Sequence, residues 1–176
     1  LNMSTLVPSK LVDIDNFFDN VLGERFQCFG CSKHNPNSLQ GKFYHSEEDD
    51  GKVYGIFPPV GISKTSFPNV VHGGVISSII DDTAYWTFFH KFRMLAVTKE
   101  MNVKYLSPCS STCSIVAIGS TDCTEKPKPG DQVEINVIVI NRETEKPVTK
   151  GSVTFFVLPE EKLTHIMGNT ASELLN

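Results

Sequence analysis

The sequence predicts a single α+β domain in which an antiparallel sheet of about six strands wraps around one central helix, with a further helix near the N-terminus. Three observations support this prediction. The chain has 176 residues, which is the usual length of one domain. The segment 73–90 has helical length and is apolar on nearly all sides, which is typical of a buried helix. Two strand-like segments precede it and four follow it, and one helix covers such a sheet only if the sheet curls around it.

The order of the elements follows from the spacing of apolar residues along the chain. Residues 11–26 have the spacing of an amphipathic helix, with Gly23 as a stop signal. Residues 61–71 are expected to be irregular because they show neither period. Strands are predicted at residues 39–45, 53–57, 95–106, 113–123, 132–141 and 148–158. The period-two pattern is clear in 95–106 and 132–141 and less regular in 113–123.

The two ends of the chain are expected to contribute little to the core. We expect residues 1–10 to form a disordered arm and residues 11–160 to form the domain. Residues 161–176 are predicted to be a frayed or weakly helical tail, as chain ends often are.

Composition excludes several classes of protein. Hydrophobic residues make up 40% and charged residues 20% of the chain, and the formal net charge is −4. No large basic surface is therefore expected, which argues against a nucleic-acid partner. No apolar run approaches the ~20 residues that cross a bilayer, so no membrane span is expected. Five cysteines without a disulfide framework are typical of a reduced protein, and we expect a cytoplasmic location, with organellar import left open.

The stretch from His72 to Asp82 has the strongest functional signal. Gly73 and Gly74 open the predicted central helix, where unpaired N–H groups and the helix dipole favour a developing negative charge. Asp81 and Asp82 lie in the middle of the same apolar helix. A buried carboxylate is costly unless it is hydrogen-bonded or used, so these acids are either catalytic or held by structural contacts or in a dimer seam.

These residues resemble the hotdog-fold acyl-CoA thioesterases, in particular the phenylacetyl-CoA-thioesterase-like subgroup. That family has a His-Gly-Gly entry to the central helix and an acidic residue nine positions after the His, which is Asp81 here. The resemblance covers roughly residues 26–158. Further matching positions are Cys28, Phe29, Gly30, Cys31, Asn35, Pro36, Leu39, Val97, Thr98, Asn102, Tyr105, Ser107 and Pro108.

The resemblance implies a thioester hydrolase of lipid metabolism that converts an acyl-CoA to a free acid and CoA, with no cofactor beyond the substrate's CoA. Asp81 would be the catalytic carboxylate, acting as general base or nucleophile. Gly73 would polarise the thioester carbonyl through its N–H, and His72 would order the loop around it. Thr98 would help to position the attacking water.

One family position departs from the pattern. Some members have an Asn six residues before the His, where this chain has Ser66, and the nearest Asn is Asn69. The auxiliary polar role is assigned to neither residue.

Spacing within the helix predicts the assembly. Gly73 and Asp81 are eight residues apart, which is ~12 Å of helical rise. One thioester carbonyl cannot contact both, so if both act they come from different subunits across a two-fold axis. This agrees with the dimer that the resemblance implies, and two such dimers could pair into a tetramer.

Two other groups of residues were weighed as sites. Lys126 and Lys128 lie in a Pro- and Gly-rich turn, and the resemblance implies contact with the phosphates of CoA, although a solvated hairpin tip is the plainer interpretation. Cys28, Cys31 and His34 offer three soft ligands within seven residues, but no second Cys-x-x-Cys pair follows. The sequence therefore predicts no metal site.

Two other functions stay open beside hydrolysis. A hotdog hydratase acting on enoyl thioesters would need a catalytic His paired with an acid at a different spacing. A non-catalytic acyl-CoA-binding dimer would keep the pocket without the chemistry.

Overall fold

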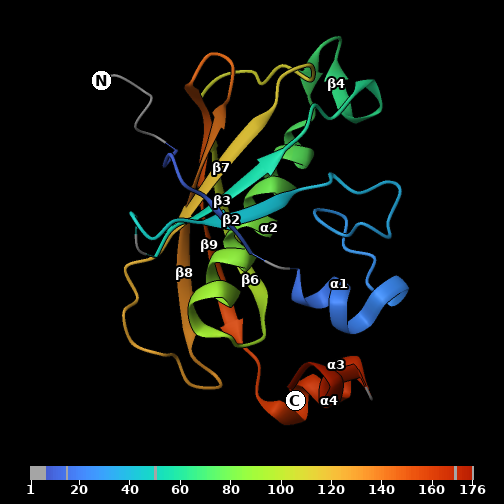
Figure 1. Cartoon of the computed structure of the whole chain (residues 1–176), viewed down its shortest axis with the longest axis vertical. Coiled ribbons are helices and arrows are strands. Elements are labelled where there is room, and N and C mark those ends of the chain that lie inside the picture. Colours follow the sequence, from blue (N-terminus) through green and yellow to red (C-terminus); the bar gives the residue numbers. More distant parts are fainter. Residues whose placement is uncertain (1–6, 15, 50, 169, 176) are drawn as a thin grey trace.

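A computed structural model describes residues 7–14, 16–49, 51–168 and 170–175 (Figure 1). The helices and short 3-10 turns are α1 (Phe17–Leu22), η2 (Gly23–Arg25), η3 (Ile62–Lys64), α2 (Gly73–Phe92), α3 (Glu160–Met167) and α4 (Thr170–Leu175). The strands are β1 (Val12–Asp13), β2 (Lys42–His45), β3 (Val53–Phe57), β4 (Thr65–Phe67), β5 (Val70–Val71), β6 (Ala96–Tyr105), β7 (Ile115–Ser120), β8 (Gln132–Asn141) and β9 (Lys146–Val157).

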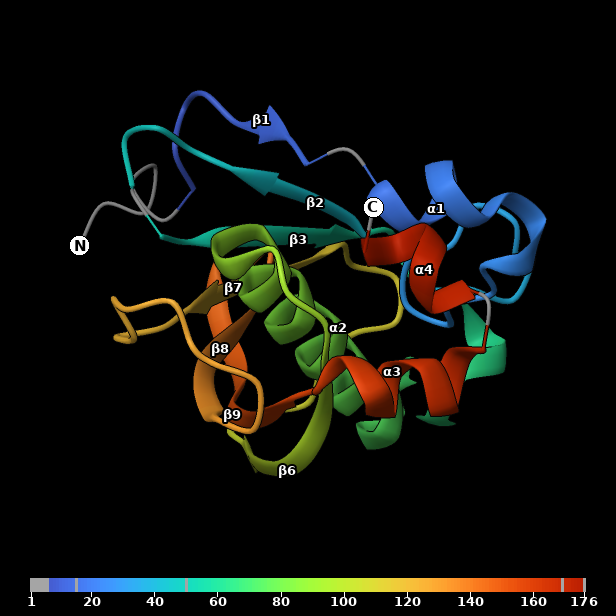
Figure 2. The same cartoon turned by 90° about the horizontal axis from the view of Figure 1, so that it is seen from below.

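Within the described residues, the main sheet is antiparallel and has the strand order β1-β2-β3-β7-β8-β9-β6. Figure 2 shows this sheet curving around α2, with β3 on one side of the helix and β6 on the other. Apolar residues of β7, β8 and β9 point at α2 and form one core with it. The predicted fold, an antiparallel sheet around a central helix, is confirmed.

The central helix begins and ends at the residues that favour such boundaries. His72 is the N-cap, and its Nδ1 accepts a hydrogen bond from the Gly74 N–H at 2.9 Å. Arg93 ends the helix in a left-handed conformation. Between them ten side chains are buried around the helix, which explains why its apolar pattern has no single face.

The N-terminal helix is shorter than predicted. Val12 and Asp13 pair with His45 and Tyr44, so these residues form β1 instead of a first helical turn. Asn16 then caps α1 by accepting a hydrogen bond from the Asp19 N–H at 3.1 Å, and Gly23 ends it as predicted. An unpaired edge of β2 competed with helix formation here, and local periodicity does not report such an edge.

The C-terminal segment is more ordered than a frayed tail. α3 and α4 bury Leu163 and Leu174, and α4 contacts α1. Arg25 forms an ion pair with Glu173 at 2.6 Å. Short helices such as these gain most of their stability from tertiary packing, which explains the weak sequence signal.

The remaining segments differ less from their predicted structure. The stretch 61–71, expected to be irregular, contains η3 and a small β4–β5 hairpin. Residues 1–6 of the expected arm lie outside the described residues, and the expected domain limits stay a prediction. No helix in the described part of the chain has the length and apolar character of a membrane span. The cytoplasmic location also stays a prediction.

Candidate active site

Asp81 and Thr98 meet where α2 packs against the start of β6. The Thr98 Oγ1–H donates a hydrogen bond to Asp81 Oδ1 at 2.6 Å. The register between β6 and β9 shifts between Thr98 and Glu100, and such a bulge turns a side chain away from its regular direction. One carboxylate oxygen is therefore held in place, while the second is left for a reacting group.

A cavity of about 410 Å³ opens beside this pair. Its walls are mostly apolar and come from α1, Phe26, the 28–31 turn, α2, the start of β6 and α3. The residues with polar groups in its lining are Asp81, Asp82, Thr98, Tyr85, Trp86 and the two cysteines of the turn. A pocket of this size with few polar groups at one place suits an apolar ligand that carries one reactive group.

The entrance of α2 is organised by residues from three segments. His72 holds the Gly74 N–H, and the Gly73 N–H precedes the first hydrogen-bonded turn, so it has no intrahelical acceptor. Tyr105, at the end of β6, donates its O–H to the Gly73 carbonyl at 2.8 Å and lies 2.8 Å from Ser77 Oγ. Tyr105 thus holds the glycine from the strand side, a contact that the sequence did not indicate.

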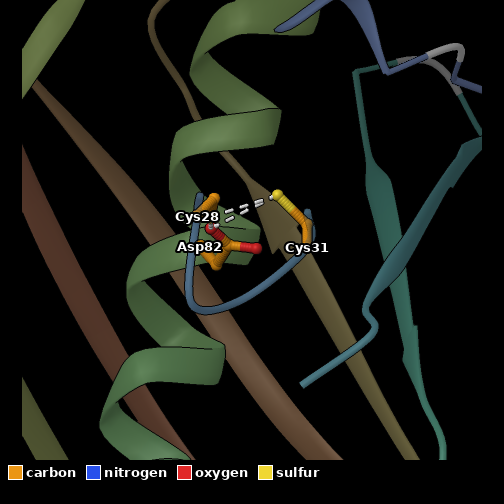
Figure 3. A group of neighbouring side chains, drawn as sticks. All are labelled: Cys28, Cys31 and Asp82. Carbon is orange, nitrogen blue, oxygen red and sulfur yellow. Dashed lines mark hydrogen bonds between the residues drawn. The ribbon is translucent and has the colours of Figure 1, made fainter. Parts of the chain in front are cut away.

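Asp82 faces a different neighbour from Asp81. Figure 3 shows its side chain directed at the loop that carries Cys28 and Cys31. Its Oδ1 is 3.3 Å from Cys28 Sγ and 3.9 Å from Cys31 Sγ, and the two sulfurs are 3.3 Å apart. The two neighbouring acids therefore have separate environments, one open to the cavity beside Thr98 and one packed against the thiols.

These contacts change the acidity of the group. Burial, followed by the nearby Cys28, raises the pKa of Asp82 well above its usual value. Hydrogen bonding from Cys31 lowers the pKa of Cys28 to about 6. The same sulfur–sulfur contact, together with burial, raises the pKa of Cys31. Burial therefore makes it costly to charge all three of these acidic groups at once without a cation.

Comparison with known proteins supports the fold. Residues 68–126 match the profile of the thioesterase superfamily. The structure of the E. coli PaaI protein is 15% identical, has a TM-score of 0.57, and covers 69% of this chain and 81% of its own. The chain has the hotdog fold, and its central part carries the signature of the thioesterase superfamily. The expected resemblance to hotdog thioesterases is thereby confirmed.

Two more hotdog structures are similar at the level of the fold. Zebrafish thioesterase superfamily member 2 is 17% identical with a TM-score of 0.58, and covers 74% of this chain and 90% of its own. A Streptococcus mutans protein, smu.793, solved with bound acetyl CoA, is 20% identical with a TM-score of 0.53, and covers 61% of this chain and 81% of its own. No curated protein matches the chain.

Two lysines and two serines of the domain lie outside the Asp81–Thr98 pair. Lys126 and Lys128 are exposed on the β7–β8 loop and do not line the cavity beside Asp81. Ser77 and Ser78 lie one turn before Asp81 on α2, and they bond to Tyr105 and to the Gly74 carbonyl.

The two candidates for the auxiliary polar role lie in the small hairpin before α2. Ser66 is exposed on β4, and Asn69 occupies the turn with a φ of 64°. Asn tolerates this left-handed conformation, which gives Asn69 a structural reason to be there.

Sequence reasoning missed the part of the cavity wall that α3 forms, here called the roof. Leu163, Ile166 and Met167 of α3 line it, but the segment was expected to be a tail. The apolar spacing of 163, 166 and 167 was the available signal, because i, i+3 and i+4 share one helix face.

Leu163→Ala should loosen this roof. Leu163 is 2% exposed and packs in the core cluster. Its truncation should lower the free energy of unfolding by about 2 kcal/mol. This value is near the low end for a buried Leu because one side of the residue faces the cavity. Cleavage by trypsin after Lys162 should then be roughly 30-fold faster than in the wild type. Mass spectrometry of the fragments measures the rate. The control is His165→Ala, an exposed residue of the same helix. Equal cleavage rates of the two variants would contradict a roof held by Leu163.

Proposed function

We propose that the protein is an acyl-CoA thioesterase that hydrolyses the thioester bond to a free acid and CoA. The observation that carries the proposal is the Asp81 carboxylate, fixed by Thr98 at the polar part of an otherwise apolar cavity. The apolar volume suits the acyl chain, and the carboxylate lies where the thioester carbonyl would end that chain.

The proposed reaction uses the N-terminus and the middle of the central helix. Asp81 either removes a proton from the attacking water or attacks the carbonyl carbon itself, and Thr98 positions the reacting group. The carbonyl oxygen gains negative charge and accepts a hydrogen bond from the Gly73 N–H, which His72 and Tyr105 hold in place. The C–S bond then breaks. In the general-base route the proton that Asp81 took from water passes to the CoA sulfur, and in the nucleophilic route water hydrolyses the acyl–Asp81 anhydride and supplies that proton.

The distance between these groups requires a second subunit. Gly73 and Asp81 are separated by ~12 Å along α2, so the glycine that serves Asp81 comes from a partner chain. β6 offers the contact surface, because it is a ten-residue strand with one unpaired edge among the described residues. Val97, Met101 and Tyr105 are exposed large hydrophobic residues on it. Pairing of two β6 edges would cover these side chains and join the two sheets.

Coenzyme A is the proposed carrier of the acyl group. Two similar structures contain it: the Streptococcus mutans protein is bound to acetyl CoA, and a hypothetical thioesterase from Streptococcus pneumoniae, 20% identical to this chain, was solved with coenzyme A. For this chain, we propose that Lys126 and Lys128 contact the CoA phosphates from their exposed loop. Pairing of two dimers into a tetramer stays a prediction.

A panel of acyl-CoAs that differ in chain length and aromatic character tests the function. We expect release of free CoA thiol from at least one of them, measured by mass spectrometry of the product so that the protein's own thiols do not interfere. The same panel includes enoyl-CoAs, whose loss of enoyl absorbance without CoA release would indicate a hydratase. Saturable binding with neither reaction would indicate a non-catalytic acyl-CoA-binding protein, and either result would overturn the proposal.

A further inference from the structure

The turn that carries Cys28 and Cys31 brings two sulfurs and a carboxylate together. The Cys28 and Cys31 Sγ atoms and a carboxylate oxygen of Asp82 all lie within 4.8 Å of one another (Figure 3). The three residues come from two segments that are more than fifty positions apart in the sequence. The fold therefore assembles a group of ligand atoms that no local motif contains.

A ring N–H group is directed at one of the two sulfurs. Trp86 Nε1–H donates to Cys31 Sγ at 3.4 Å from the adjacent turn of α2. Such a donor favours the thiolate, which is the form of cysteine that binds metals, and orients it toward the third ligand.

One oxygen of the Asp82 carboxylate is buried without a hydrogen-bond partner among the described residues. This oxygen, Oδ2, is shielded from solvent. A methyl group at Gly30 would overlap the Asp82 carboxyl, so the turn needs glycine in order to accept the acid this close. A buried carboxylate next to two thiols is costly unless a cation neutralises it.

We propose that Cys28, Cys31 and Asp82 bind a soft divalent cation of the zinc class. Zinc takes thiolate and carboxylate ligands with little preference beyond tetrahedral geometry. Because all three residues line the cavity, a water molecule in the cavity can supply the fourth ligand. The cation would tie the 28–31 turn to α2 and so fix the wall of the cavity one residue from Asp81.

The alternative for two sulfurs 3.3 Å apart is a disulfide. A disulfide would leave Asp82 without a cation or a hydrogen-bond donor from the thiols, so the carboxylate favours the metal site. This proposal departs from the prediction of no metal site, which considered His34 as the third ligand and found no second Cys-x-x-Cys pair.

Metal content tests the proposal without any substrate, so its failure is separate from a failure of the proposed hydrolysis. The purified full chain is reduced, loaded with Zn²⁺ and desalted, and zinc is measured by mass spectrometry. We expect about one zinc per chain, and at least 100-fold weaker binding in a competition with a chromogenic chelator for Cys28→Ser and for Asp82→Asn. Cys123→Ser is the matched control, because Cys123 bonds elsewhere, to the Glu125 carbonyl, and should leave zinc binding unchanged.

Cobalt gives an optical readout of the same ligands. Co²⁺ bound by two thiolates should produce a near-ultraviolet charge-transfer band, which Cys28→Ser should weaken and Cys123→Ser should not. The proposal is overturned if the loaded wild type holds less than about 0.1 zinc per chain. It is also overturned if Cys28→Ser retains the zinc.

Discussion

Asp81→Asn should lower kcat for acyl-CoA hydrolysis at least ~100-fold, the usual scale for the loss of a general base. The amide has the size of the carboxylate and can still accept the Thr98 hydrogen bond through its oxygen. It cannot, however, take a proton from water or attack a carbonyl carbon. Steady-state kinetics with the best substrate of the acyl-CoA panel gives the measurement, and circular dichroism checks that the fold is intact.

The adjacent acid provides the matched control. Asp82→Asn changes the same chemical group one residue further along α2, where it contacts Cys28 and Cys31 and not Thr98. We expect a much smaller loss in kcat together with a change in stability, because the buried cluster is altered. An inactive Asp82→Asn beside an active Asp81→Asn would show that the catalytic carboxylate has been assigned to the wrong residue.

Mixing two inactive variants should restore roughly a quarter of wild-type activity, if each site takes Gly73 from one subunit and Asp81 from the other. One variant is Asp81→Asn, and the second is Gly73→Pro, which removes the N–H donor at the first helical position where proline is tolerated. After joint unfolding and refolding in equal amounts, about half of the dimers are mixed. Each mixed dimer has one site with both lesions and one site with none.

Gly73→Ala controls for the added bulk. A Cβ at position 73 would lie 3.3 Å from the Tyr105 ring, so any side chain there presses on Tyr105. Alanine adds that carbon but keeps the N–H, and it should therefore remain far more active than proline. Activity that fails to return, with mixed dimers verified by native mass spectrometry and both variants folded, would rule out a site shared between subunits.

The hydrophobic periodicity of the sequence was sufficient to predict most of the buried helices and strands. Strand β3 and strand β8 begin and end at the predicted residues, and α2 extends only two residues beyond its predicted end. These elements are buried, so their apolar patterns reflect their final environment. The resemblance placed Asp81 and Thr98 in one site, and their 2.6 Å hydrogen bond agrees with that pairing.

Elements held by remote partners could not be predicted in the same way. β1 exists because the edge of β2 was free to pair, and α3 and α4 are held by contacts with the core and with α1. The partner that stabilises such a segment, a free strand edge or a packing surface, lies elsewhere in the chain. The local sequence of the segment therefore does not reveal it.

The sequence by itself determined the central helix, the antiparallel strands around it and the position of the acids on that helix, because hydrophobic periodicity and spacing are local properties. Only the tertiary structure decided which acid faces which partner. Asp81 and Asp82 are neighbours in sequence, yet successive helical residues point about 100° apart. One therefore meets Thr98 from β6 and the other meets Cys28 and Cys31 from a distant turn. Those encounters depend on how the strands and the turn pack around α2, and that packing is a property of the whole chain.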